Sequence, residues 1–261
     1  MQETSTPCRP AADPDRIGLI PVLRDNYVIV LHNDRQAVVV DPAEAEPVRQ
    51  WLQQRQLELA AVLQTHHHAD HIGGTPGLLH HWRTAQVYAA AADRQRIPLQ
   101  HHGLVDGQEI VLLGRPAQVL AVPGHTRHHI AYYLPPLPHA TRAGGELFCG
   151  DTLFAAGCGR LFEGSPAEML TSLQRLAALP PSTRVWCAHE YTEANLRWAA
   201  AMVPEDAPIR ERLEAVRQQR ARGEATIPST IALEHGTNLF VRARDAGQLA
   251  ALRQSKNDWQ G

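Results

Sequence analysis

The sequence predicts an α+β fold in which a region of mixed strands and helices is followed by a mostly helical region. Short apolar runs broken by polar turns occupy the larger, N-terminal part of the chain, as is typical of strands. Beyond this part the spacing becomes helical, because Ile209, Leu213 and Val216 fall on one face of a helix. A chain of 261 residues is long enough for two domains. We therefore expect one domain over residues 17–189 and a second over residues 190–261.

The expected elements follow the chain in order. Three apolar runs at residues 17–22, 27–31 and 37–40 are separated by polar triplets, which predicts an antiparallel meander. The remaining strands are expected at residues 61–64, 86–88, 110–113, 118–122, 130–134, 147–149 and 184–187. Helices are expected at residues 44–57, 166–179, 193–202, 209–222 and 248–255. A further short helix is expected to begin after a cap at Ser229.

The composition limits the kinds of partner that the protein can have. Lys and Arg number 25 against 27 Asp and Glu, so there is no strong field of one sign to attract nucleic acid. No apolar run reaches the roughly 20 residues that a membrane span needs, and residues 1–16 lack the pattern of a secretory signal. Four scattered cysteines, at positions 8, 149, 158 and 187, are expected to be reduced thiols. We expect a cytoplasmic protein with a small-molecule substrate and with no nucleic acid or membrane partner.

A dense histidine cluster follows the strand expected at residues 61–64. His66 and His68 are two residues apart, so in an extended loop their rings point to the same side. Asp70 continues this alternation, and His71 faces the other way where the chain enters a helix. The glycine pair at residues 73–74 permits the tight backbone path that lets these side chains converge. This pattern predicts metal ligands on a strand-to-helix loop.

Three single residues complete the predicted metal site, each just after an expected strand: His125, Asp151 and His189. A lone histidine or a Gly-Asp pair is usually an ordinary core, surface or turn residue. These three are therefore predicted as ligands only because the histidine cluster is also present. Imidazole and carboxylate ligands together are what a catalytic metal site needs, and seven ligands make two sites. The predicted partition places His66, His68 and His125 on one ion, Asp70, His71 and His189 on the other, and Asp151 as the bridge.

The remaining histidines are expected to be bystanders. His67 points away from its two neighbours in the alternating loop. The other histidine pairs have no carboxylate nearby at a matching spacing, so they are predicted to lie on the surface: His80 and His81, His101 and His102, His128 and His129.

Several motifs carry a family resemblance: residues 65–71, Pro123-Gly124-His125-Thr126, Gly150-Asp151-Thr152-Leu153-Phe154 and Cys187-Ala188-His189-Glu190-Tyr191-Thr192. They resemble the metallo-β-lactamase superfamily, and within it the chain is similar to the bacterial hydroxyacylglutathione hydrolases, also called glyoxalase II. The segment at residues 157–164 is the part that is specific to glyoxalase II, and the likeness runs from about residue 17 to 259. The resemblance implies a four-layered αββα sandwich followed by a helical substrate-binding domain.

The same resemblance implies roles for individual residues. Asp70 and Asp151 become the predicted catalytic residues. The positions that match glutathione-binding positions of the family are Arg160, Phe162, Tyr191, Arg253 and Lys256. One of them departs from the pattern, because Phe162 stands where some members carry a tyrosine, and it cannot donate a hydrogen bond. Arg253 and Lys256 are three residues apart and can present two cations from one helix face, although without the resemblance a solvated helix face is the ordinary interpretation.

The activity implied by the resemblance is hydrolysis of S-D-lactoylglutathione to D-lactate and glutathione, the second step of methylglyoxal detoxification. It implies two divalent metal ions per chain, with zinc expected and iron or manganese suited to the same ligands. Metal-bound water with a pKa of about 7 supplies hydroxide for attack on the thioester carbonyl. Thiolate is a good leaving group, so no protein acid is needed. The protein is expected to act as a monomer.

Two other functions fit part of the pattern. A persulfide dioxygenase of the same superfamily needs one iron held by two histidines and a carboxylate, which His125, Asp151 and either His66 or His68 could supply. The segment at residues 158–160 and the C-terminal cations argue against it. A metal-binding protein without catalysis would leave the mixed set of ligands unexplained.

Overall fold

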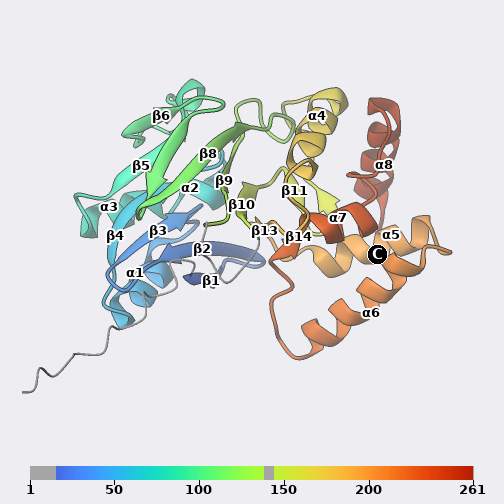
Figure 1. Ribbon diagram of the computed structural model, residues 1–261, viewed down its shortest axis with the longest axis horizontal. Helices are drawn as coiled ribbons and strands as arrows, with labels where there is room; N and C mark the ends of the chain where they lie inside the picture. The colour runs from blue at the N-terminus through green and yellow to red at the C-terminus, as the bar shows by residue number, and fades with distance from the viewer. Residues whose placement is uncertain (1–15, 138–143, 261) are drawn as a thin grey trace, which may run out of the picture.

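The computed structural model describes residues 16–137 and 144–260 and is built around two β-sheets (Figure 1). The first sheet has six strands in the order β1-β2-β3-β4-β5-β6. Its strands are β1 (Arg16–Val22), β2 (Asn26–His32), β3 (Gln36–Val40), β4 (Glu58–Leu63), β5 (Gln86–Ala90) and β6 (His102–Leu104). The first three strands pair antiparallel, which confirms the predicted meander, and the strands from β3 to β6 pair parallel. Cys8 lies outside the described residues.

The second sheet also has six strands, in the order β14-β13-β10-β9-β8-β7. Its strands are β7 (Glu109–Leu112), β8 (Arg115–Ala121), β9 (Ile130–Leu134), β10 (Glu146–Gly150), β13 (Arg184–Cys187) and β14 (Ser229–Thr230). The short strands β11 (Leu153–Phe154) and β12 (Gly157–Cys158) form a separate hairpin. Parallel pairing of β10 with β13 requires a crossover, which α4 (Pro166–Ala177) provides.

The remaining helices flank the sheets and fill the C-terminal region. They are α1 (Ala45–Gln54), α2 (Ala69–Ile72), α3 (Thr75–His81), α5 (Thr192–Met202), α6 (Ala207–Ala221), α7 (Ile231–Thr237) and α8 (Ala246–Asp258). The predicted cap at Ser229 is wrong by one residue. Thr230, the last residue of β14, caps α7 by accepting the Leu233 N–H, whereas the Ser229 hydroxyl donates to Glu234.

Alternation along the strands creates the layers. In β2, Val28 and Val30 pack toward α1 and α3, whereas Ile29 and Leu31 face the second sheet. The other face of the second sheet packs against α4 and the C-terminal helices. Burial of each such side chain is worth about 1.5–3 kcal/mol. The order helix, sheet, sheet, helix confirms the αββα sandwich, with α1 and α3 on the left of Figure 1 and α4 on the right.

The C-terminal helices share a core with the second sheet. Ile209, Leu213 and Val216 are all buried, as their helical spacing predicts. Trp198 of α5 stacks on Phe240 with ring centroids 5.2 Å apart. One continuous cluster therefore joins the sheet to the helical region, and β14 adds a strand from that region to the sheet.

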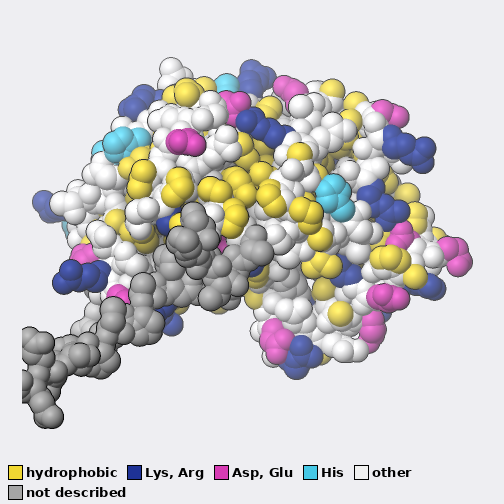
Figure 2. Space-filling view, viewed as in Figure 1, with side chains coloured by type: hydrophobic (Ala, Val, Ile, Leu, Met, Phe, Trp, Pro, Cys, Tyr) yellow, Lys and Arg dark blue, Asp and Glu magenta, His cyan; other side chains and the backbone are white. Residues whose placement is uncertain are grey.

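Some short elements are absent from the sequence-based predictions. Strands β6, β11 and β12 have only two or three residues, too few to show a period. Helix α3 begins with Thr-Pro-Gly and ends in two histidines, which is a weak helical signal. On the face seen in Figure 2, side chains of both charges are interspersed, in keeping with the near-neutral composition. Within the described residues, no helix is long and apolar enough to cross a membrane.

Candidate metal centre

The predicted ligands come from loops at the ends of strands in both sheets. His66 and His68 follow β4, and His125 follows β8. Asp151 directly follows β10, and His189 lies two residues after β13. The structure brings these five residues together with the two ligands predicted on α2, so that all seven surround one small space.

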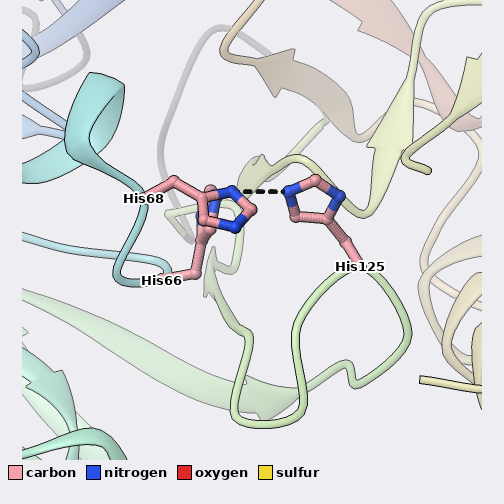
Figure 3. Close-up of side chains that lie close together, drawn as sticks. All are labelled: His66, His68 and His125. Carbon is pink, nitrogen blue, oxygen red and sulfur yellow. Dashed lines mark hydrogen bonds between the residues drawn. The ribbon is translucent and has the colours of Figure 1, made fainter. Parts of the chain in front are cut away.

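The first group of ligands meets around the ring of His68 (Figure 3). Its Nδ1 atom lies 3.0 Å from Nε2 of His66 and 3.0 Å from Nε2 of His125. Ligand atoms of these three residues all lie within 4.8 Å of one another. The grouping is the one that the sequence predicts for the first ion.

The second group consists of Asp70, His71 and His189, whose ligand atoms also lie within 4.8 Å of one another. Asp151 lies between the two groups. Its Oδ1 atom is 3.4 Å from Nε2 of both His71 and His189, and its Oδ2 atom is 3.5 Å from Nε2 of His125. One carboxylate oxygen thus faces each group, as a bridging ligand would require.

Two buried atoms indicate that this space suits a cation. Nε2 of His71 and Oδ1 of Asp151 are buried and make no hydrogen bond. Buried polar atoms are normally satisfied, so a pair of orphaned ligand atoms that face each other calls for an additional partner. Imidazole nitrogens and carboxylate oxygens are the ligands that zinc, iron and manganese share. The residues present therefore fit a divalent metal.

The protonation states suit metal binding at His66, His68, His125 and Asp151. Burial, followed by neighbouring imidazoles, lowers the pKa of His66 well below its usual value and that of His68 to about 4. Burial also lowers the pKa of His125. Burial alone would raise the pKa of Asp151, but His71 and His189 outweigh it and hold the pKa well below the usual value. Neutral imidazoles and an ionised carboxylate are the forms that bind metal. At the second group, Asp151 outweighs the effect of burial and raises the pKa of both His71 and His189, so a cation that binds there displaces protons from these two imidazoles.

Acidic residues that the sequence-based prediction missed orient two of the histidines. Asp41, directly after β3, accepts the Thr65 N–H at 2.8 Å and lies 3.0 Å from Nδ1 of His71. Asp25 lies 2.9 Å from Nδ1 of His189. Such partners fix the ring orientation and tautomer of ligand histidines. The position of Asp41 at a strand end was a usable signal, whereas Asp25 looks like any turn residue.

His129 is the clearest error among the predicted bystanders. It was expected on the surface, but it is fully buried just before β9. Its Nε2 atom accepts the Asp151 N–H at 3.1 Å, and its ring stacks on His66 with centroids 4.7 Å apart. The prediction failed because it considered only carboxylate side chains close in sequence. The actual partner of His129 is the backbone amide of Asp151, at the end of another strand.

His67 is turned away from the ligands, as predicted. Its Nε2 atom lies 3.2 Å from Arg96 Nη1, and its Nδ1 atom lies 3.4 Å from the Asp93 carboxylate. His80, His81, His101 and His102 are exposed, as predicted.

The glycine pair serves a different purpose from the one expected. Gly73 and Gly74 both have ordinary helical backbone angles, so they do not provide a special turn. A Cβ atom on Gly74 would lie 2.6–2.8 Å from the backbone of residues 42–45. The glycine therefore allows close packing of the ligand loop against the chain before α1.

A cavity of about 660 Å³ opens beside the metal ligands. It is lined in part by the five predicted substrate-binding residues, Arg160, Phe162, Tyr191, Arg253 and Lys256. Tyr191 stacks on His189 with centroids 4.8 Å apart, and Phe162 lies edge-on to His68 and His125 at 5.6 and 5.3 Å. Phe154 and Asn195, which the sequence-based prediction missed, also line the cavity.

The two C-terminal cations differ in exposure. Arg253 is only 7% exposed and donates to the Cys158 carbonyl at 2.8 Å, so it is not on the solvated helix face that its sequence suggests. Lys256 is half-buried, donates to the Ala194 carbonyl at 2.8 Å and lies 4.5 Å from the Trp259 ring centroid. Burial and then the charge of Arg253 lower the pKa of Lys256 to about 8.

Comparison with known proteins places this site in a family. A model of the metallo-beta-lactamase superfamily matches residues 21–189, and a model described as the hydroxyacylglutathione hydrolase C-terminus matches residues 190–259. The chain belongs to the metallo-β-lactamase superfamily. A hydroxyacylglutathione hydrolase of Prochlorococcus marinus is 57% identical over 99% of both chains, and one of Parasynechococcus marenigrum is 56% identical over 92% of this chain and 96% of that one. Within the superfamily, the chain belongs to the hydroxyacylglutathione hydrolase family.

Solved structures support the fold and the metal chemistry. ETHE1 from Myxococcus xanthus is 25% identical with a TM-score of 0.67, over 94% of this chain and 92% of that one. TTHA1623 in a di-iron-bound form is 25% identical with a TM-score of 0.56, over 85% of this chain and 98% of that one. Together with the ligand groups of this chain, they support the metallo-β-lactamase fold and the binding of divalent metal.

Proposed function

We propose that the protein hydrolyses S-D-lactoylglutathione, and S-2-hydroxyacylglutathiones generally, to the free hydroxy acid and glutathione, as the second step of methylglyoxal detoxification. The observation that carries this proposal is the single cavity that joins the metal ligands to Arg253 and Lys256. Such a cavity can hold a thioester at one end and a carboxylate of the glutathione part at the other. The name shared by full-length relatives supports the same substrate.

We further propose that the site holds two divalent ions, with zinc expected and iron or manganese also suited to the ligands. His66, His68 and His125 would hold one ion, and Asp70, His71 and His189 would hold the other. Asp151 would bridge them. The two groups share no residue, and Asp151 has one oxygen toward each, which supports this assignment. Asp41 also has a carboxylate oxygen within 4.8 Å of ligand atoms of His66 and His71, but it faces Nδ1 of His71 and leaves Nε2 for the ion.

Bound divalent cations supply hydroxide at neutral pH and polarise the thioester carbonyl. The chain's own residues prepare the site for that chemistry. Asp25 holds the ring of His189 at Nδ1, and Asp41 holds the ring of His71 in the same way. The Nε2 atom of each histidine therefore points at the ligand space. Phe154 lines the cavity and lies edge-on to His189, with ring centroids 5.8 Å apart. No side chain has to protonate the product, because thiolate is a weakly basic leaving group.

We propose a monomer as the functional unit. We propose that the protein works in the cytoplasm, where glutathione keeps thiols reduced. The three cysteines among the described residues are free, in keeping with that environment.

The test is an assay of thioester loss from S-D-lactoylglutathione, followed by its ultraviolet absorbance, with metal analysis and oxygen uptake on the same sample. We expect metal-dependent loss of thioester, release of one free thiol per turnover and no oxygen consumption. Oxygen uptake with a persulfide substrate and a single bound iron would instead show the dioxygenase activity. If the protein binds metal but turns over neither substrate, it is a metal-binding protein without either catalytic activity.

A further inference from the structure

The hairpin of β11 and β12 is held from outside by a side chain of the helical region. Asn238 is fully buried just after α7, and its Nδ2 atom donates to the carbonyl oxygens of Phe154 at 3.2 Å and Gly157 at 2.9 Å. Its Oδ1 atom accepts the Phe240 N–H at 3.0 Å. One amide thus joins both strands of the hairpin to the helical region.

A second buried side chain fixes the turn of the same hairpin. Ala156 has a φ of +56°, in the left-handed region that non-glycine residues rarely adopt. The fully buried Glu234 carboxylate accepts the Ala156 N–H at 2.8 Å. The same oxygen lies 2.8 Å from Nδ2 of Asn238, whose two hydrogens are shared among this oxygen and the two hairpin carbonyls. Arg212 donates to the other oxygen of Glu234 at 2.8 Å. A buried acceptor with this many donors can hold a strained turn in place.

The hairpin reaches the metal centre at both of its ends. It begins two residues after Asp151. The ring of Phe154 lies edge-on to His189. The chain that leaves the hairpin places the Arg160 carbonyl 2.8 Å from Nδ1 of His125. A displaced hairpin would therefore disturb three of the proposed ligands.

We propose that Asn238 and Glu234 are positioning residues of the metal centre, which act through the β11–β12 hairpin without touching substrate. Neither residue lines the cavity described above. The inference rests on the proposed metal site. The helical region then has two tasks, because it supplies the cations for the remote end of the substrate and part of the framework for the ligands.

The test uses two variants that loosen the hairpin in different ways. In Asn238→Ser, the hydroxyl can still accept the Phe240 N–H but is too short to reach the two hairpin carbonyls. In Glu234→Asp, the charge beside Arg212 remains but the oxygen withdraws from the Ala156 N–H. Outer partners of ligand residues are typically worth 10- to 100-fold in metal affinity or activity. We expect metal to bind about tenfold more weakly in each variant, and kcat to fall with a glutathione thioester and with a truncated thioester alike.

His235→Ala is the matched control. His235 lies on α7 beside Glu234, and its Nε2 atom bonds to the Ala177 carbonyl of α4 at 2.8 Å, away from the hairpin. For all three variants and the wild type, we would measure the metal dissociation constant by chelator competition, the unfolding midpoint in guanidinium and the exchange rate of the Ala156 amide. Faster exchange and weaker metal binding in the two hairpin variants, with wild-type metal binding in His235→Ala, is the expected result.

Several results would overturn the proposal. A lower unfolding midpoint with unchanged metal affinity and kcat would show that the contacts only stabilise the fold. Failure of both hairpin variants to fold while His235→Ala folds would lead to the same conclusion, and so would an equal loss of metal affinity in the control. If the wild type does not hydrolyse lactoylglutathione, the proposed function fails, but the metal affinities still decide this inference.

Discussion

The two ends of the cavity are built in different ways. At the metal end, four of the seven proposed ligands fall within residues 66–71, and the other three each follow a strand. The predicted substrate-binding side is assembled from separate segments: Arg160 comes from the loop after the hairpin, and Arg253 and Lys256 come from α8, whereas Tyr191, just before α5, stacks on the proposed ligand His189. The metal end is compact in sequence, and the substrate end is assembled only by folding.

The difference reflects what each end has to do. Metal ligands must converge to within a few ångströms and stay there, which favours short loops on a rigid sheet. A cation that holds the far end of a substrate acts over a longer distance and can come from any helix that reaches the cavity. We therefore expect changes at the first end to cause large losses of rate and of bound metal, and changes at the second to raise KM by a smaller factor.

The largest effect is expected for Asp151→Asn. The amide has no charge to balance two cations, so metal occupancy and turnover should fall together, by at least about a hundredfold in turnover. Metal analysis and kcat on the same preparation measure this. A variant that keeps both its metal content and a near-normal rate would show that Asp151 is not the bridge.

A comparison of two adjacent histidines sharpens the assignment of the cluster. His68→Ala removes a proposed ligand and should lose most of the rate, on the order of the loss in the Asp151 variant. His67→Ala is the matched control, because His67 faces Arg96 and Asp93 instead of the ligand space, and it should keep most of the rate. Equal losses of rate in the two variants would mean that His68 is wrongly assigned as a ligand and His67 as a bystander.

At the other end, Lys256→Ala should mainly raise KM. A charge-assisted contact of this kind is worth on the order of 1–2 kcal/mol, or roughly a five- to thirtyfold rise in KM, with little change in kcat. The effect should disappear with a truncated thioester that lacks the glycine carboxylate. Arg197→Ala is the control, because Arg197 also approaches the Trp259 ring but is exposed outside the cavity. A similar KM change with both thioesters would argue against a glutathione-specific contact.

The smallest effect concerns pH. Burial lowers the pKa of Lys256 to about 8, so the cation is present below that pH and is lost above it. KM for the glutathione thioester should therefore rise above about pH 8 toward the value of Lys256→Ala. Lys256→Arg keeps its charge and should lack this rise. Because Lys256 is the only lysine in the chain, ¹³C methylation would let its pKa be followed directly by NMR. A pH-independent KM in the wild type would contradict the prediction.

The sequence was informative about the fold and the ligands because both rest on local patterns. The apolar run at residues 27–31, bounded by polar triplets, predicted a strand, and the spacing of His66 and His68 predicted a shared direction. The predicted alternation does not extend to Asp70, because α2 already begins at Ala69. The residues that the sequence-based prediction missed make their contacts with segments that are distant along the chain. His129 meets Asp151 only when β9 and β10 pair, and Asp25 meets His189 across 164 residues of chain. No local period marks such partners.

The most direct test of the account is a titration of metal-free protein with Zn²⁺, in which lactoylglutathione hydrolysis and bound metal are measured at each step. We expect a rate that depends on metal and reaches its full value at two ions per chain. A full rate with one ion per chain, or thioester loss that does not respond to metal, would contradict the central claim that two ions work between these seven ligands.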